Sequence, residues 1–375
     1  MSQVNSGVEV IREVLVRGPI ARSELSSVLG LSAPSLTRIA RPYIDSGLLL
    51  ELEESRDGSM GRPTRPLVVS ADIGRVIGIK ITGDHIHLVL TDMRAHAVAQ
   101  ADAPIESSNP EDVARQIGQL VHELAGQSEH PVLHVGVCLG GSVSDDGRVL
   151  RAPFLGWRDV PLGEMLERSV GLPITLENDV VALAKAEYLV GAARGVPDFS
   201  LITIGVGIGY GLVIHGHAVK SADTGLGLGG HVTVDPSGPF CPYGHRGCAR
   251  AMLSIDSICA QGRVALGRDV SYKELLALAT AGEPAPQAII ESAASALGRL
   301  IFLSTSLIMH PTVVLSGDGI ALWDVAESTV RAAANVQRDP DASPLNIIVD
   351  KSGFEAWARG AAAVAIEHSL AQLAL

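Results

Sequence analysis

The stretch LPITLENDVVALAKAEYLVG, residues 172–191, indicates the fold class of this chain. Its first eight residues have the apolar content of a strand and end in Glu177-Asn178-Asp179, and the residues that follow have the composition of a helix. Polar residues at a junction between a strand and a helix are typical of the ligand sites of α/β folds. We therefore expect an α/β protein with Asn178 and Asp179 at a functional site.

Four further segments repeat this pattern on both sides of the junction. Residues 75–92 predict a hairpin of alternating apolar residues, and residues 132–143 predict a buried strand that runs into a Gly-Gly loop. Residues 200–216 predict a strand, a Gly-rich turn and a second strand, and residues 311–320 predict a strand followed by a Gly turn. The glycines of the third segment fit a tight hairpin and a phosphate loop about equally well, because Gly-x-Gly-x-Gly alone is a weak signal.

Length and composition narrow the class of protein. The 375 residues are 47% apolar, and this length predicts two or three domains. The four cysteines form no disulfide framework in so long a chain and indicate a reducing cytosol. The longest apolar stretch, residues 201–214, is shorter than a membrane span and is broken by glycine. We expect a soluble, cytoplasmic protein that does not enter a membrane.

The N-terminal segment differs in charge from the rest of the chain. Residues 1–66 contain eight Arg and eight Asp or Glu, so the net charge of −12 belongs to the residues after them. Residues 8–17 and 23–30 predict two short helices, and a third begins after Ser32, a favourable N-cap. Pro42 should weaken or kink this third helix after Arg41. Two short helices joined by a tight turn are typical of a helix-turn-helix.

The polar side of the third helix suits DNA. Its small side chains would let the helix enter a major groove, and two arginines would reach phosphates or guanine edges. Residues 48–70 predict two strands around a polar turn, a wing whose arginine would reach a minor groove. The predicted DNA-contacting residues are Ser32, Ser35, Thr37, Arg38, Arg41 and Arg62. The alternative is a small helical domain that only oligomerises and has a solvated polar face.

Taken in order, these segments resemble the ROK family of repressors, open reading frames and sugar kinases, with residues 156–187 as the most specific stretch. The resemblance covers nearly the whole chain. It implies a two-lobed, actin-like ATPase fold of the ribonuclease H type and assembly as a homodimer or tetramer. It also implies a winged helix-turn-helix domain at residues 1–70, a first lobe at 71–180 and a second lobe at 181–375, with the C-terminal helix packing back on the first lobe.

The chain departs from the family's kinases at the first phosphate loop. Those kinases have an Asp-Gly-Gly-Thr-like loop that holds phosphate and magnesium, whereas residues 78–84 read GIKITGD, with Lys80 in place of the acidic residue. A phosphate and metal site without its carboxylate loses much of its charge complementarity. Asp179 matches the family's catalytic base but suits a helix cap equally well. We therefore expect no enzymatic activity.

Three positions that contact sugar hydroxyls in the family also differ. Phe154 stands in place of Asn, and Leu228 and Arg250 each stand in place of Glu. The ligand-binding residues that the resemblance implies here are Asn178, Asp179, His231 and Arg250. Loss of hydroxyl partners weakens hexose binding, and the gain of Arg250 favours a sugar phosphate or a sugar acid. The alternative is that Arg250 faces solvent and that no small effector exists.

The segment CPYGHRGC, residues 241–248, resembles the family's zinc motif with one ligand replaced. Three residues match zinc ligands of that motif: His231, Cys241 and Cys248. Tyr243 occupies the position of the missing cysteine, and neutral tyrosine is a poor zinc ligand. His245 or a water molecule would complete a structural zinc site, and a metal-free loop held by packing is the alternative.

We therefore expect a DNA-binding transcriptional regulator, a repressor of carbohydrate metabolism, whose body resembles a sugar kinase but is not catalytic. It would bind a two-fold double-stranded DNA operator as a homo-oligomer and respond to a small effector. Two alternatives remain. One is a kinase that phosphorylates hexoses with ATP and carries an accessory head, and the other is a protein that binds a protein partner through its acidic body.

Overall fold

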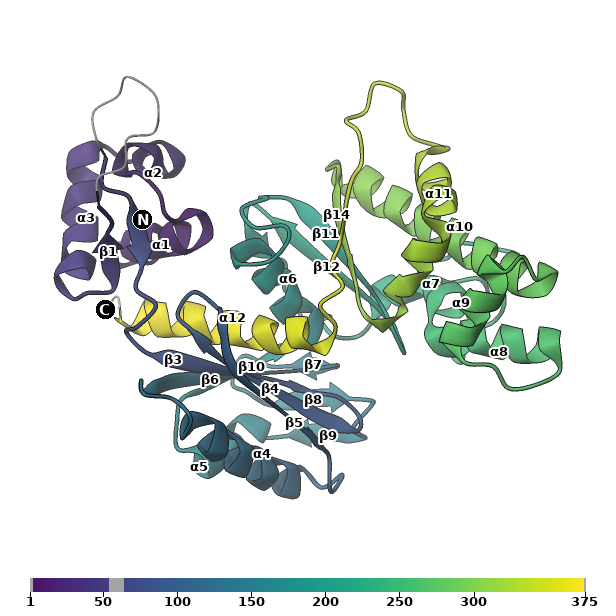
Figure 1. The fold of residues 1–375 in the computed structure, drawn as a ribbon, viewed down its shortest axis with the longest axis horizontal. Coiled ribbons are helices and arrows are strands. Elements are labelled where there is room, and N and C mark those ends of the chain that lie inside the picture. Colours follow the sequence, from purple (N-terminus) through teal and green to yellow (C-terminus); the bar gives the residue numbers. More distant parts are fainter. Residues whose placement is uncertain (1–2, 54–63, 374–375) are drawn as a thin grey trace. The chain divides into compact units, whose positions relative to one another are not determined.

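The computed structural model describes residues 3–53 and 64–373, which divide into two units (Figure 1). The first unit comprises the chain up to Gly195 together with the residues from Phe354 onward, and the second comprises Val196–Gly353. The expected boundary after residue 180 falls inside helix α6 (Asp179–Leu189), which packs against the C-terminal helix α12 (Phe354–Leu373). Because of this packing, the first unit extends beyond α6 and includes α12.

The first unit begins with three helices and two short strands. They are α1 (Gln3–Arg17), α2 (Arg22–Leu29), α3 (Ala33–Asp45), β1 (Leu49–Glu51) and β2 (Leu67–Val69). The strands pair antiparallel, with Leu49 opposite Val69, and the small core includes the fully buried Leu25 and Leu36. This is the element order of a winged helix-turn-helix. The tip of the predicted wing, with Arg62, lies outside the described residues.

Helix α3 does not weaken after Arg41 as expected, because it continues through Pro42 to Asp45. Proline removes the backbone N–H that would bond to the carbonyl one turn earlier. Pro42 is exposed, so water can bond to that carbonyl and the helix tolerates the loss. The predicted N-cap is confirmed, since the Ser32 hydroxyl accepts a hydrogen bond from the N–H of Ser35 at 3.3 Å.

A five-stranded sheet in the order β10-β6-β3-β4-β5 forms the centre of the first unit. Its strands are β3 (Arg75–Ile81), β4 (His85–Asp92), β5 (Ala97–Pro104), β6 (Val132–Leu139) and β10 (Ile174–Asn178). The predicted hairpin at residues 75–92 is confirmed, because β3 and β4 pair antiparallel. A smaller sheet contains β7 (Ser142–Val143), β8 (Val149–Ala152) and β9 (Trp157–Val160).

Successive side chains of β3 point to opposite faces of this sheet, and each face packs against different helices. Ile77, Ile79 and Ile81 pack into a core with α4 (Pro110–Ala125) and α5 (Leu162–Val170). The opposite face carries Gly78, where a Cβ atom would lie 2.0 Å from the carbonyl oxygen of Ala358 in α12. Glycine is therefore required for α12 to lie directly on the sheet, as the yellow ribbon in Figure 1 does. Lys80 lies on this same face because it is two residues from Gly78.

The second unit contains a five-stranded sheet in the order β13-β12-β11-β14-β15. Its strands are β11 (Phe199–Ile204), β12 (Ile208–Ile214), β13 (His217–Ala218), β14 (Thr312–Ser316) and β15 (Asn346–Val349). The glycines after β11 form a tight hairpin turn, in which the Gly205 N–H donates to the Gly207 carbonyl at 3.0 Å.

Five helices and two short 3-10 turns complete the second unit. They are α7 (Ala249–Leu253), α8 (Ile255–Leu266), α9 (Tyr272–Thr280), α10 (Pro284–Ile308), α11 (Ala321–Asn335), η1 (Leu228–His231) and η2 (Asp318–Ile320). Within the described residues, α10 alone is long and apolar enough to cross a membrane. Its side chains, Leu297 and Ile301 among them, pack into the core of the second unit, as expected of a core helix.

Candidate functional site

Residues predicted to contact DNA lie along the exposed side of α3. Ser32, Thr37, Arg38 and Arg41 are exposed and Ser35 is half-buried. A shallow hollow on this side is lined by Ala33, Pro34, Thr37, Arg38, Arg41, Pro42 and Asp45. The Arg41 guanidinium lies 3.6 Å from the Asp45 carboxylate, yet its side chain is 78% exposed and free to leave that weak pair. The helix thus presents two cations and small side chains to solvent.

The junction after β10 holds Asn178 and Asp179 in defined positions. Asn178 caps α6, because its Oδ1 accepts from the N–H of Val181 at 3.2 Å and its Nδ2 donates to the Gly141 carbonyl at 2.9 Å. The Oδ1 atom of Asp179 accepts from the N–H of Val180 at 2.9 Å. These contacts use the free N–H groups of the first turn of α6 to fix both side chains.

Lys80 pairs with Asp179, the residue that matches the catalytic base of the kinases. Its Nζ lies 2.5 Å from Asp179 Oδ2 and 4.8 Å from the centre of the Trp357 ring, and only 6% of its side chain is exposed. A carboxylate that neutralises a buried ammonium is held in place by that pairing, because breaking a buried pair costs several kcal/mol. Asp179 therefore acts as a structural counter-ion here.

Local sequence patterns do not predict this pair, because in the sequence alone Lys80 only replaces a metal-holding carboxylate. One signal was available, because Lys80 is the single charged residue inside the apolar strand at positions 76–81. A charge in such a strand needs a partner, and the Asp at the predicted site was a candidate. The aromatic contact from Trp357 carried no signal in the sequence, because it depends on how α12 crosses the sheet.

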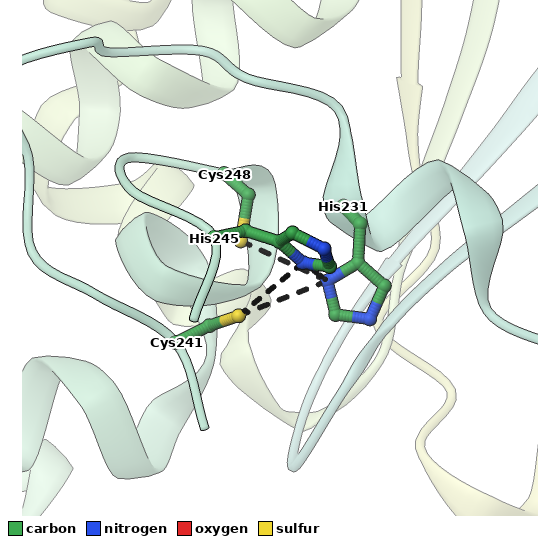
Figure 2. A group of neighbouring side chains, drawn as sticks. All are labelled: His231, Cys241, His245 and Cys248. Carbon is green, nitrogen blue, oxygen red and sulfur yellow. Dashed lines mark hydrogen bonds between the residues drawn. The ribbon is translucent and has the colours of Figure 1, made fainter. Parts of the chain in front are cut away.

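The knuckle at residues 241–248 brings four metal-binding side chains together, as Figure 2 shows. They are His231, Cys241, His245 and Cys248, and their ligand atoms all lie within 4.8 Å of one another. Cys241 Sγ is 3.9 Å from His231 Nδ1 and 3.6 Å from His245 Nδ1, and the two Nδ1 atoms are 3.0 Å apart. Tetrahedral zinc with ordinary bond lengths places such atoms roughly 3.3–3.8 Å apart. The observed separations extend on both sides of this range, from 3.0 Å between the two Nδ1 atoms to as much as 4.8 Å. The four side chains would therefore bind a four-coordinate ion after shifts of about 1 Å or less.

Backbone geometry brings these side chains together. The Cys241 N–H donates to the His245 carbonyl at 2.9 Å, which closes the turn that carries both residues. Gly247 has a φ of 60°, and a Cβ there would lie 1.5 Å from the Asp235 carbonyl oxygen. Only glycine allows the chain to pass this point before Cys248, the N-cap of α7.

Two of the four side chains are shifted toward the forms that bind a metal, whereas burial raises the pKa of the Cys248 thiol. Burial, followed by the neighbouring His245 and Arg250, lowers the pKa of His231 and favours the neutral imidazole. Burial opposes ionisation of Cys241, but hydrogen bonds from the N–H groups of Tyr243 and His245 outweigh it and lower the pKa of the thiol. Neutral imidazole and thiolate are the forms that bind zinc.

Tyr243 lies beside this group and is not a fourth donor. Its ring meets His231 edge-on at 5.1 Å and is 55% exposed. The Arg250 guanidinium lies 5.5 Å from the centre of the same ring. Arg250 is thus held against the knuckle by Tyr243 rather than extended freely into solvent.

The predicted ligand-binding residues fall in both units. Asn178 and Asp179 belong to the first unit, and His231 and Arg250 belong to the second. Phe154, which stands in place of a hydroxyl-binding Asn, flanks the Gly140 loop in the first unit. A Cβ on Gly140 would lie 3.3 Å from both the Phe154 ring and Asp179 Oδ2. An apolar surface therefore borders the site of Asp179.

Known proteins are similar to this chain both in the residues after the helix-turn-helix segment and in that segment itself. Residues 76–368 match the sequence model of the ROK family. The DNA-binding transcriptional repressor Mlc of Escherichia coli strain K12 is 27% identical over 353 residues, which cover 89% of this chain and 86% of the repressor. The solved structure of a ROK family transcriptional regulator, a homolog of the E. coli MLC protein, matches with a TM-score of 0.81 and 25% identity. That match covers 98% of this chain and 96% of the regulator.

A ROK hexokinase from Thermus thermophilus also matches, with a TM-score of 0.67 and 26% identity. It covers 78% of this chain and 97% of the hexokinase. Nearly the whole enzyme is thus similar to part of this chain, whereas the regulator is similar to almost all of it.

Proposed function

The chain belongs to the ROK family, and we propose that it is a DNA-binding transcriptional repressor with a sugar-kinase-like effector domain. The observation that carries this proposal is the similarity to a ROK transcriptional regulator over 98% of the chain, the three N-terminal helices included. The exposed face of α3 agrees with it, because its small side chains and two arginines suit a major groove.

The alternative, a sugar kinase with an accessory head, is disfavoured by the first unit. A kinase of this fold needs a carboxylate that is free to accept the proton of a sugar hydroxyl. Asp179 instead neutralises the buried Lys80, which also occupies the place of a residue that would help to hold phosphate and magnesium. An ATP-consumption assay on hexoses tests this alternative, and turnover would contradict the proposal.

Binding to DNA would use Arg38 and Arg41 for phosphates or guanine edges, with Ser32, Ser35 and Thr37 fitting against the groove. Arg62 would reach the minor groove from the wing. Pairing of two chains would place two α3 helices on the half-sites of a two-fold operator. The test is selection of genomic fragments by the purified protein, followed by affinity measurements at several salt concentrations. Failure to retain any fragment, even at low salt, would contradict the proposal.

The effector is a sugar phosphate or a sugar acid in this proposal. Phe154 and Leu228 remove hydroxyl partners, whereas Arg250, held against Tyr243, adds a cation beside His231. Asn178 and Asp179 are the proposed hydroxyl-binding residues of the first unit. A thermal-shift screen of neutral sugars, sugar phosphates and sugar acids tests the effector class. A ligand at a hundred times its Kd adds about 2.7 kcal/mol to stability. Equal affinity for a neutral hexose and its phosphate or acid would contradict the anionic class.

The knuckle would hold a structural zinc ion. His245 would be the fourth ligand in place of the missing cysteine, with His231, Cys241 and Cys248 as the others. A closed four-ligand site has no open position for a substrate. Zinc would therefore stabilise the loop that precedes α7, the helix that carries Arg250. The expected zinc content is one ion per chain.

A further inference from the structure

Helix α1 ends in a sequence that leaves two of its carbonyls without the usual donors. The N–H that would bond to the Leu15 carbonyl belongs to position 19, which is a proline and has none. The N–H that would bond to the Val16 carbonyl belongs to Ile20, which donates instead to the Leu67 carbonyl of β2 at 3.0 Å. The end of α1 therefore needs donors from elsewhere in the fold.

Arg194, which follows α6 in the chain, supplies those donors. Its Nη2 donates to the Leu15 carbonyl at 3.0 Å and its Nε donates to the Val16 carbonyl at 2.5 Å. Nη2 also donates to the Gly18 carbonyl at 3.0 Å. A cation at the C-terminal end of a helix is also favoured by the helix dipole. Arg194 is thus the C-terminal cap of α1, although 176 positions separate it from Gly18.

The loop that carries Arg194 is fixed to the last turn of α6. The Ala192 N–H donates to Glu187 Oε2 at 2.8 Å, and the Gly195 N–H donates to the Tyr188 carbonyl at 3.0 Å. Glu187 is buried, so its carboxylate bonds to the loop and not to solvent. Any displacement of α6 must therefore move Arg194 with it.

Side chains make further contacts between α1, α6 and α12. Glu367 of α12 pairs with Arg12 of α1 at 3.2 Å and with Lys185 of α6 at 3.4 Å. The Tyr188 hydroxyl lies 3.4 Å from Glu13 of α1, and the Arg12 guanidinium lies 4.8 Å from the centre of the Tyr188 ring. The C-terminal end of α6 thus contacts the helix that supports α3.

The N-terminal end of α6 is the junction that carries Asn178 and Asp179. Helix α6 has 11 residues and is therefore about 16 Å long, and it connects this junction directly to the contacts with α1. We propose that α6 and Arg194 couple the Asn178–Asp179 site to the DNA-binding head: a change in the contacts of Asp179 alters the hold of Arg194 on α1. This inference rests on the proposed function for its consequence, which is the orientation of α3 toward DNA. Arg194 is a positioning residue, since it acts through α1.

Hydrogen exchange of the full-length protein tests the coupling without a ligand or an operator. Arg194→Met keeps the aliphatic stem and removes the donors, and we expect about tenfold faster exchange in the last turn of α1, the change produced by about 1.4 kcal/mol. Exchange in α4, on the opposite face of the sheet, should not change. Arg158→Met, at an exposed position of β9, is the matched control and should leave α1 unchanged.

A second substitution at the far end of α6 provides the decisive comparison. Lys80→Met removes the partner of Asp179 and should accelerate exchange in α1 of the wild-type background, but it should have no added effect on α1 when Arg194→Met is present. Equal effects of Lys80→Met in both backgrounds, or no effect on α1 in either, would overturn the coupling. Unchanged exchange in α1 of Arg194→Met would overturn the cap itself.

A conservative substitution distinguishes loss of the helix cap from general misfolding. Arg194→Lys keeps the charge but not the fork of donors, so α1 should exchange at a rate between those of the wild type and Arg194→Met. Equal rates for the Lys and Met variants, with α4 affected in both, would assign the effect to the fold as a whole and overturn the positioning role. DNA binding is measured separately, so its failure contradicts the proposed function and leaves the α1 result standing.

Discussion

The pair of Lys80 and Asp179 makes a quantitative prediction about the stability of the first unit. Replacing Lys80 by Met leaves the Asp179 carboxylate, which is 14% exposed, without its cation. Breaking a buried pair in this way costs about 3–5 kcal/mol. Asp179 keeps hydrogen bonds from the N–H of Val180 and from Asn178 Nδ2, so we expect the lower figure of about 2–3 kcal/mol.

Asp179→Asn tests the other half of the pair. It leaves the Lys80 ammonium buried against Trp357, whose ring offsets about 1 kcal/mol of the loss, so the expected cost is again about 2–3 kcal/mol. The double variant buries no unpaired charge and should cost no more than about 2 kcal/mol. The two substitutions should therefore be non-additive by at least about 2 kcal/mol.

Urea unfolding followed by tryptophan fluorescence measures all four proteins, because Trp357 lies beside the pair. Each single substitution should lower the midpoint by about 1 M urea, given slopes of about 1–3 kcal/mol/M. The reasoning fails if Lys80→Met leaves the midpoint unchanged or if the double variant costs the sum of the two singles. Either result would mean that Asp179 is free and remains available as a base.

Three further predictions follow from separate parts of the molecule. Arg38→Ala and Arg41→Ala should each weaken operator binding, by about 1–3 kcal/mol where the arginine contacts a base, whereas Arg158→Ala should not. If these variants bind the operator as tightly as the wild type in a titration, the recognition face is misplaced. His245→Ala should lower the zinc content of the purified protein and make the melting temperature insensitive to chelator, whereas His217→Ala, at an exposed position, should change neither. Undiminished zinc in His245→Ala would exclude His245 as a ligand. Burial, with the neighbouring His368, lowers the pKa of His134 to about 4, so the unfolded chain binds the extra proton as pH falls from 6.5 toward 4 and stability decreases by up to about 3 kcal/mol. His134→Gln should remove this part of the pH dependence in urea unfolding at pH 7 and pH 4.5, and an unaltered dependence would contradict the assignment.

Local patterns in the sequence predicted several elements of each unit. The alternation at residues 75–92 predicted the β3–β4 hairpin, and Ser32 predicted the start of α3, because each depends on residues close together in the chain. Motif spacing likewise placed three donors in the knuckle and identified Tyr243 as the odd residue. The expected effect of Pro42 failed because exposure, a property of the folded surface, decides whether the lost hydrogen bond matters.

The sequence by itself determined the α/β class, part of the order of helices and strands, the family to which the body belongs and the residue types at its site. Only the tertiary structure decided which of those residues are partners. Lys80 meets Asp179 across 99 positions because β3 and β10 lie in one sheet, and Arg194 reaches the end of α1 because α6 and α1 pack side by side. His245 joins the other three donors because the turn between the cysteines points its ring inward. Short-range periodicity encodes none of these contacts, since each depends on the packing of elements that are distant in the chain.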